Sequence, residues 1–414
     1  DGGVGVIFSR LAIEGPIIED KLSFLVAARR SYIDVLAKPF LEDGLEDSQF
    51  YFYDLTAKTN WKIDENNTIF ASGYFGRDVF GAGFGFDWGS ETFTTRWNHL
   101  FSDKLFSNTS LIASNYAYEF KIGSGDDAFG VKAAILDYNI KQDFSYYFND
   151  KNTIKFGLNT IYHTFSPGEL IATNPSFTPI KLSKRLASEN AVYIQNEQKF
   201  SELFSIQYGI RYSFFSSLGN NDSIKTFNEE GIQTGSVYYQ KHESAKFYGG
   251  FEPRLAMKYM LDETSSVKMS YNRNYQYIHL LSNTNASSPT DAWVPSSNNI
   301  KPQISDQFSL GYFQNFKSNT YKFSVEVYYK NMQNQIDYDV SVSKYINIAK
   351  SRIRGAQLSF SKQFQSDLSL NSTLTYQSAK NLKTNKDLGR TPDFLASVEM
   401  SYKIGNKQRL TNWW

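Results

Sequence analysis

Alternation of apolar and polar residues with a period of two is the feature that most constrains how this chain can fold. In residues 321–329 the odd positions are all apolar or aromatic, while the even positions carry Lys322, Ser324, Glu326 and Tyr328. Successive side chains of a strand point to opposite faces of the sheet. The pattern therefore predicts a strand with one apolar face and one polar face.

The same alternation recurs along the whole chain. Its strands run to about 10 residues or more, whereas strands of soluble proteins cluster near 5 or 6. A tilted strand needs about 9 to 11 residues to cross a bilayer, so these strands are long enough to span a membrane. The apolar positions of the further stretches are Phe204, Ile206, Tyr208, Ile210, Tyr212 and Phe214; Val267, Met269 and Tyr271; Leu368, Leu370, Leu374 and Tyr376; and Val398, Met400, Tyr402 and Ile404.

The connections between these strands alternate between short joints and long polar loops. Short turns on one rim and long loops on the other are typical of outer-membrane barrels, with the turns periplasmic and the loops extracellular. The short joints fall near residues 19–21, 64–67, 102–104, 149–152, 201–202, 261–264, 317–319, 365–367 and 405–407. The long loops are expected at about residues 34–48, 78–90, 122–130, 165–187, 218–245, 278–304, 333–351 and 379–393.

Strands can span a bilayer only as a closed barrel, because an open edge leaves backbone polar groups unpaired in hydrocarbon. The segments between joints give roughly seventeen complete strands, with a further one broken off at each end. The sequence thus predicts an all-β fold, a large transmembrane antiparallel β-barrel. Soluble folds with many strands are the alternatives, namely a β-propeller, a β-sandwich array or a β-helix. They are disfavoured because there is no fixed blade repeat and propeller strands are shorter.

The composition agrees with this interpretation and excludes several functions. Aromatic residues make up 16% of the chain, and they favour strands and membrane interfaces. The longest apolar runs, such as Phe24 to Ala28, are far too short for a spanning helix of about 18 residues. A net charge of +1 gives no field that would recruit nucleic acid. The absence of Cys excludes disulfides and thiolate metal sites.

Several short motifs, taken in order, resemble the barrel of TonB-dependent receptors of Bacteroidetes. Residues 2–17 and 24–34 resemble the start of that barrel, where a Gly-Pro turn (Gly15-Pro16) and an Asp-Lys pair (Asp20-Lys21) close the first periplasmic joint. The resemblance runs the length of the chain and identifies a class of protein, but not a substrate. The further matches are residues 193–199, 208–212, 252–256, 270–273 and 355–358.

This resemblance implies an N-terminal plug domain inside a barrel of about 22 strands in the full protein. A TonB box on the plug couples uptake to the TonB–ExbB–ExbD complex of the inner membrane. No plug precedes Asp1, and the chain ends at Trp413-Trp414 before the last strands of such a barrel. We therefore expect residues 1–414 to be a receptor barrel domain that is truncated at both ends.

The function expected from the resemblance is active uptake of a scarce solute across the outer membrane. The solute would be an iron chelate, a vitamin, an oligosaccharide or a peptide. A passive porin-like channel and a surface adhesin are the alternatives. The partners expected are the TonB complex, lipopolysaccharide and outer-membrane lipid, the small solute and a surface lipoprotein, but no nucleic acid. Polar residues expected to face inward, around the plug, are Arg211, Lys268, Arg273, Lys322 and Glu326.

The loop at residues 278–304 is the best candidate for binding a ligand. It contains Trp293 and His279 and is flanked by Tyr277 and Tyr275. Aromatic side chains in long loops form stacking surfaces for sugars, peptides or chelates. We therefore predict ligand contacts for Trp293, Tyr277 and His279. The alternative for the two tyrosines is an aromatic girdle that holds the strand ends at the membrane interface.

Other motifs point to ordinary loop or rim positions. The glycine-rich run at residues 81–86 lacks the strand, helix and βαβ unit of a dinucleotide site, so we expect an exterior loop. Asp126-Asp127 lacks the spaced carboxylates of a calcium motif. Arg29 and Arg30 are neighbours on a strand, so one points inward, and the outward one is placed to meet lipopolysaccharide phosphates or to be an ordinary rim charge.

The titratable residues do not form a catalytic or metal-binding motif. The four histidines are not spaced like ligands on one helix or hairpin. Nucleophile, base and acid would all have to come from strands that are not adjacent in the sequence. We therefore expect no enzyme activity, no cofactor, no metal and no catalytic residue. The histidines are His99, His163, His242 and His279.

Overall fold

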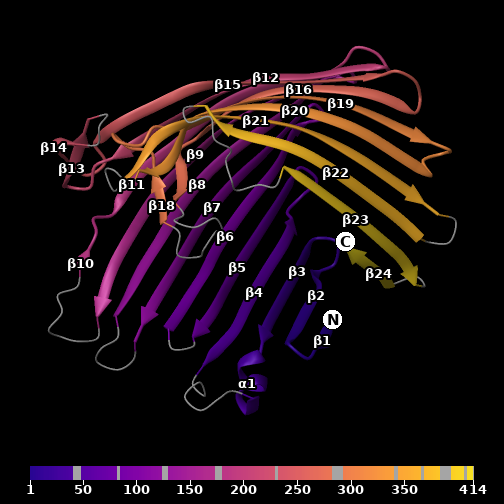
Figure 1. Ribbon diagram of the computed structural model, residues 1–414. Helices are drawn as coiled ribbons and strands as arrows, with labels where there is room; N and C mark the ends of the chain where they lie inside the picture. The colour runs from indigo at the N-terminus through magenta and orange to yellow at the C-terminus, as the bar shows by residue number, and fades with distance from the viewer. Residues whose placement is uncertain are drawn as a thin grey trace.

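A single curved antiparallel sheet dominates the computed structural model (Figure 1). The structure describes residues 1–40, 48–81, 84–123, 129–172, 180–228, 232–281, 292–339, 344–364, 368–382, 393–404 and 408–413. Within these residues the sheet contains 20 strands, and two separate hairpins add two strands each. Among the described helices, none is long and apolar enough to cross a membrane.

Seventeen strands of 10 to 21 residues form the wall of the sheet. They are β2 (Phe8–Ile18), β3 (Leu22–Ser31), β4 (Gln49–Lys62), β5 (Asn67–Gly81), β6 (Phe84–Ser102), β7 (Leu105–Ile122), β8 (Phe129–Asn149), β9 (Asn152–Ala172), β11 (Arg185–Lys199), β12 (Phe204–Leu218), β15 (Ser244–Met260), β16 (Ser265–Gln276), β19 (Gln303–Phe316), β20 (Tyr321–Asp339), β21 (Lys344–Gln363), β22 (Leu368–Asn381) and β23 (Phe394–Ile404). The short strands β1 (Gly2–Val4), β10 (Ile180–Lys181) and β24 (Gln408–Trp413) complete it. The prediction of roughly seventeen complete strands is confirmed, whereas a strand broken off at each end stays a prediction.

The wall is an up-and-down meander, in which each long strand pairs with the next long strand of the chain. The hairpin β13 (Asp222–Phe227) and β14 (Gln233–Tyr239) lies in the connection between β12 and β15. The hairpin β17 (Ile278–Leu281) and β18 (Ala292–Pro295) lies between β16 and β19. Among the described residues β1 pairs only with β2 and β24 only with β23, so the curved sheet has two edges. Figure 1 shows both chain ends on the same side of the molecule.

The strand register separates an apolar face from a polar face. Leu310 of β19 lies opposite Val327 of β20, and Leu358 of β21 lies opposite Val325 on the same face of β20; Leu310, Val327 and Leu358 are each 42–48% exposed. The residues beside them, Glu326 and its partner Gln357, point to the other face. An exposed apolar surface of this extent is stable against lipid, not against water. The apolar face is therefore the outer, lipid-facing surface, and the polar face lines the hollow.

The register corrects one sequence-based prediction, the inward orientation of Arg273. Lys268 is directly opposite Gly311 on the inner face, so the odd-numbered Met269, Tyr271 and Arg273 of β16 share the outer face. Arg273 forms an ion pair with Asp306 on the same face, with 2.7 Å between Nε and Oδ1. The charge of Arg273 does not by itself give its orientation, whereas the alternation that starts from Tyr271 places it outward. The register places Arg211, Lys268, Lys322 and Glu326 on the inner face as predicted.

Short turns join the strands at one rim, which we call the short-turn rim. In one of them Asp262 accepts hydrogen bonds from the backbone N–H groups of Thr264 and Ser265 and from the Ser265 hydroxyl. These hydrogen bonds lower the pKa of Asp262 to about 2. In another turn, hydrogen bonds from Asn67 and the Asn66 backbone lower the pKa of Asp64. Turn carboxylates of this kind compensate backbone donors that no strand satisfies.

Strands extend further at the opposite rim, the long-loop rim, than the sequence indicated. The predicted loop at 78–90 is mostly strand, because β5 continues to Gly81 and β6 begins at Phe84. The expected glycine-rich exterior loop is thus largely part of a strand pair. Strands β9 and β20 likewise enter the segments expected to be loops. Within the described parts of the connections, helix occurs in the first one, as α1 (Ile33–Ala37) and the 3₁₀ turn η1 (Lys38–Phe40).

Candidate functional site

The inner face of β4 to β8 carries a row of apolar side chains close to the long-loop rim. Phe50, Phe80, Phe86, Phe120 and Val131 are direct cross-strand partners on five consecutive strands. The ring centroids of Phe50 and Phe80 are 5.0 Å apart, and those of Phe86 and Phe120 are 6.3 Å apart. Such pairs stabilise adjacent strands and present a continuous apolar surface.

A second row, one step further from the long-loop rim, adds three aromatic residues. Phe52, Trp88 and Tyr118 lie on β4, β6 and β7, with Asp78 of β5 between Phe52 and Trp88. The Trp88 ring contacts Phe86 at a centroid distance of 4.8 Å. Phe86 and Tyr118 are buried, whereas Phe80 is 38% exposed. We call this surface the aromatic wall; it consists of Phe50, Phe52, Phe80, Phe86, Trp88, Tyr118 and Phe120.

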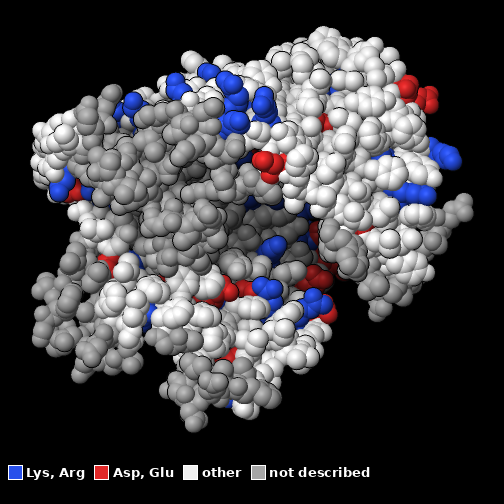
Figure 2. Space-filling model, viewed as in Figure 1, with Lys and Arg blue, Asp and Glu red and all other residues white. Residues whose placement is uncertain are grey.

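The inner face of β8 to β15 has a different chemistry. Glu252 of β15 is 4% exposed, accepts a hydrogen bond of 2.6 Å from the Ser213 hydroxyl, and faces Arg211 and Arg254 at 3.7 and 3.3 Å. A buried carboxylate is stable only with such partners. Figure 2 shows side chains of both charges around the hollow of the molecule.

A buried histidine extends this network along β9. The Nδ1 atom of His163 lies 2.7 Å from the Asp137 carboxylate, and its Nε2 atom lies 4.0 Å from Glu189. Within the described part of the chain, His163 Nε2 has no hydrogen-bond partner. We call this surface the ionic wall; it consists of Asp137, His163, Glu189, Arg211, Glu252 and Arg254.

The hairpin β17–β18 folds over the ionic wall, and Tyr277 anchors it. The Tyr277 ring stacks on Phe215 of β12 at 5.2 Å with an interplanar angle of 7°. Its hydroxyl lies 2.8 Å from the Ser213 hydroxyl, which also donates to Glu252. Tyr277 belongs to one buried cluster with Phe165 of β9 and with Ala187 and Phe215. The hairpin thus extends away from β16 and β19, the strands that it connects, and reaches β9, which β18 contacts.

The hairpin brings together the three residues predicted to bind ligand. Tyr277 and His279 are 2% and 1% exposed, whereas Trp293 is 37% exposed and lies opposite Leu280. The His279 ring lies 2.9 Å from the Ser296 hydroxyl and 3.2 Å from the Gln303 amide. Burial lowers the pKa of His279 to about 4. Tyr277 and His279 therefore hold the hairpin in place, and Trp293 is the side chain available to a ligand.

Other residues named in the sequence lie apart from this site. Arg29 faces inward and pairs with Asp54, with 2.8 Å between its Nε and the carboxylate, whereas Arg30 points outward over the Tyr51 ring. His99 contacts Asn67, and His242 contacts Tyr162. Asp126-Asp127 lies outside the described residues. No group of three or more metal-ligating side chains occurs in the regions that the structure describes.

Sequence reasoning missed the aromatic wall, although a signal for it exists. On β4 and β6, aromatic residues at Phe50, Phe52, Phe86 and Trp88 occupy positions that belong to the inner, elsewhere polar face. The available clue is that, near a strand end, aromatic residues occupy positions that face inward instead of outward. The prediction of a loop at residues 78–90 hides this signal, because part of the aromatic wall lies within those residues.

The fold defines a class of protein. A meander of membrane-length strands with an apolar outer face, a polar inner face, short turns on one rim and long loops on the other is an outer-membrane barrel architecture. The family model described as "TonB dependent receptor-like, beta-barrel" matches residues 28–413. The chain belongs to this family and is located in the outer membrane. The long-loop rim is accordingly extracellular and the short-turn rim periplasmic.

Individual proteins support this membership. An uncharacterized TonB-dependent receptor of Haemophilus influenzae is 23% identical over 270 residues, which is 60% of this chain and 71% of that protein. The copper transporter OprC superposes with a TM-score of 0.71 at 13% identity, over 96% of this chain and 63% of its own. The ferric yersiniabactin uptake receptor FyuA from Yersinia pestis superposes with a TM-score of 0.68 at 14% identity, over 98% of this chain and 65% of its own. The chain thus spans slightly less than two thirds of the length of these solved structures. Its resemblance specifically to receptors of Bacteroidetes stays a prediction.

Proposed function

We propose that this barrel takes up a scarce solute actively across the outer membrane, and that the solute is a metal chelate with flat organic faces. The observation that carries the proposal is the pair of unlike walls facing the extracellular mouth of one hollow. Structural neighbours of this chain include a ferric citrate transporter and a ferric-catecholate import receptor. Their names support the choice of a chelate among the solutes that this architecture accepts.

Each of the two walls would bind a different part of the chelate. The exposed ring of Phe80 on the aromatic wall offers a stacking surface for an aromatic or planar chelating group. Arg254 is exposed beside the buried Glu252 and offers a cation to the anionic groups of a chelate. Trp293 on the hairpin adds a further ring. Release into the periplasm would be driven through a plug domain by the TonB–ExbB–ExbD complex.

Further partners belong to the same proposal. The apolar outer face, with residues such as Leu310 and Val327, lies against outer-membrane lipid and lipopolysaccharide. A surface lipoprotein would meet the extracellular rim. Family membership does not favour the alternatives of a passive porin-like channel or a surface adhesin.

The test is accumulation of ⁵⁵Fe in whole cells that carry the gene, compared with a deletion strain. The probes are ⁵⁵Fe complexed with a catecholate or with citrate. We expect at least one complex to accumulate about tenfold less in the deletion strain, and this difference to vanish when a protonophore collapses the proton gradient. Accumulation that persists without the gradient would indicate a passive channel. Cell-surface binding without accumulation would indicate an adhesin.

A further inference from the structure

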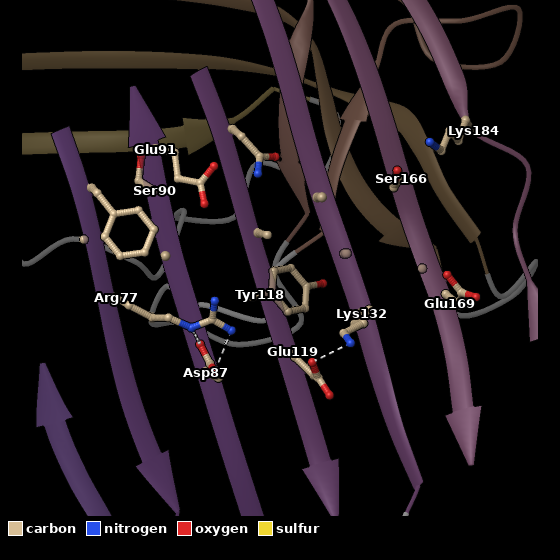
Figure 3. A pocket seen from close by; sticks show the side chains of 18 of the residues that line it. Arg77, Asp87, Ser90, Glu91, Tyr118, Glu119, Lys132, Ser166, Glu169 and Lys184 are labelled. Atoms are coloured by element: carbon tan, nitrogen blue, oxygen red, sulfur yellow. Dashed lines mark hydrogen bonds and ion pairs between the residues drawn. The ribbon is translucent and has the colours of Figure 1, made fainter. Parts of the chain in front are cut away.

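A cavity of about 300 Å³ lies on the outer face of β5 to β9, close to the extracellular rim (Figure 3). Its floor is one cross-strand row: Arg77, Gly89, Ala117, Ala134 and Ser166 are direct partners on the five strands. This row shares its face with Leu111 and Phe93, both exposed apolar residues of the lipid-facing surface. The groove is therefore outside the barrel, behind the aromatic wall.

The groove lies directly above the apolar band of the outer face. Phe93, Ala113 and Tyr138 form the cross-strand row four residues closer to the periplasmic side on β6, β7 and β8. Phe93 and Tyr138 are both more than half exposed, as residues that face lipid are. Four residues of strand correspond to about 13 Å before tilt. This places the groove at the level of the headgroups of the outer leaflet.

Small side chains keep the groove open. A Cβ atom on Gly89 would approach the Gly76 carbonyl oxygen to 2.7 Å, so this position requires glycine. Ala117 and Ala134 continue the floor on the next two strands. The register of β8 and β9 shifts between Lys132 and Ala134, so the regular pairing is interrupted at the end of the groove. Larger residues here would fill the cavity.

The charged side chains that line the groove nearly balance, with Arg77, Lys132 and Lys184 against Asp87, Glu91, Glu119 and Glu169, and several of them form fixed ion pairs. Arg77 holds Asp87 with two hydrogen bonds of 2.7 and 2.8 Å. Glu119 accepts from Lys121 and Lys132, each at 2.9 Å. Figure 3 shows the Arg77–Asp87 and Glu119–Lys132 pairs in the groove. A lining that compensates its own charge is suited to a neutral, hydroxyl-rich ligand, because a phosphate would require surplus cations.

The remaining lining suits a sugar ring. Glu91 and Asn115 are partners on β6 and β7 and supply an acceptor and an amide. Phe75, opposite Glu91, gives an exposed ring at one end of the groove. Planar carboxylate, amide and guanidinium groups bind neighbouring hydroxyls in pairs, and an aromatic face packs on the C–H face of a sugar. We propose that this groove binds the saccharide headgroup of a glycolipid in the outer leaflet.

The test uses substitutions that fill the groove on the outer face and leave the inner face of the barrel unchanged. Ala117→Phe and Ala134→Phe each place a ring on the floor, and Ala356→Phe on the outer face of β21 is the matched control. Protein in detergent is titrated with lipopolysaccharide, with the core oligosaccharide released from it by mild acid, and with phosphatidylglycerol. Heat-dependent gel mobility checks that each variant is folded.

We expect the parent protein and Ala356→Phe to bind lipopolysaccharide and the free oligosaccharide, and the two groove variants to bind both at least tenfold more weakly. Unchanged binding in the groove variants would overturn the proposal. So would phosphatidylglycerol competing as well as lipopolysaccharide, because the site would then recognise anionic lipid. Self-association lost in Ala117→Phe would assign the groove to a second copy of the chain. None of these outcomes affects solute uptake through the hollow, which the ⁵⁵Fe assay measures separately.

Discussion

The aromatic wall and the ionic wall face the same hollow from the same sheet, yet among the described residues a hairpin folds over the ionic wall alone. Both are built on long antiparallel strands with continuous pairing. The rings of the aromatic wall satisfy one another by direct contact, and Phe80 remains open to the hollow. On the ionic wall Glu252 is buried beneath Tyr277 and the hairpin that follows it.

The difference shows how side chains, and not the backbone, decide which part of a barrel mouth stays open. Stacked rings need no further partner, whereas buried carboxylates need fixed donors and exclusion of water around them. Ser213 of β12 is the donor to Glu252, and Tyr277, which leads into the hairpin, contacts the Ser213 hydroxyl and covers it from water. The following predictions test this distinction, beginning with the largest expected effect.

Tyr277→Ala removes the anchor of the hairpin. The loss of a buried, stacked ring should destabilise the docked hairpin by about 3 kcal/mol. Hydrogen exchange of residues 278–281 and 292–296 should then accelerate by about a hundredfold, while β20 and β21 keep their protection. Tyr277→Phe, which loses only the hydroxyl contact to Ser213, should cost about 1 kcal/mol. Equal protection in Tyr277→Ala and the parent protein would show that the hairpin is held by other contacts.

Acidification should loosen the same hairpin through His279. Its pKa is about 4 in the folded hairpin, below the ordinary value of 6.5. Between these values an exposed histidine binds a proton that the buried one does not, so the stability present above pH 6.5 declines as the pH falls towards 4. The loss should reach about 2 kcal/mol at pH 5.

Fluorescence of Trp293 as a function of pH measures this loosening against the background of the other Trp residues, with Trp293→Phe for subtraction. His279→Gln keeps a hydrogen-bonding side chain but cannot titrate, so it should flatten the profile. A pH profile that is unchanged in His279→Gln would exclude this residue as the cause.

Phe80→Ala should weaken chelate binding by about 1 kcal/mol, or roughly fivefold, through loss of one stacking surface. Its matched control is Phe93→Ala, which removes an exposed ring from the outer face. Binding of the ⁵⁵Fe complex that proves active in cells is measured on the purified protein. A larger loss in Phe93→Ala than in Phe80→Ala would contradict the assignment of the aromatic wall to the ligand.

Asp54→Asn should have the smallest effect. The Arg29–Asp54 pair lies beside the aromatic wall and its Arg29 side chain is about half exposed, so the substitution should change stability by less than about 1 kcal/mol. Glu252→Gln disturbs a buried carboxylate with several partners and should be clearly more destabilising. Thermal unfolding, followed by loss of heat-dependent gel mobility, compares the two. Similar midpoints for both variants would remove the distinction between an exposed and a buried network.

The wall of the barrel could be predicted from the sequence because its faces follow a local rule. Alternation such as that in residues 321–329 depends only on which side of one strand meets lipid. It predicted the number of complete strands and the inward orientation of Lys322 and Glu326. The same rule, applied strictly from Tyr271, would also have given the outward orientation of Arg273.

The site was harder to predict because it depends on contacts between distant strands. Tyr277 and Phe215 are 62 positions apart in numbering, and no local pattern indicates that the hairpin folds back onto β12. The aromatic wall forms only when Phe50, Phe80, Phe86 and Phe120 come into register. Above the apolar band, strands such as β5 and β6 no longer alternate in polarity, so their ends resembled loops.

The most direct test of the account is the orientation of alternate side chains in a membrane. The chain has no Cys, so single substitutions from Ile353→Cys to Ser361→Cys on β21 can each carry one spin label. In lipid vesicles, labels at positions 354, 356, 358 and 360 should be accessible to oxygen dissolved in lipid, and those at 355, 357 and 359 to a water-soluble nickel complex. A period of two between these accessibilities is the predicted result. Equal accessibility to both reagents along β21 would contradict a wall that separates lipid from a hollow.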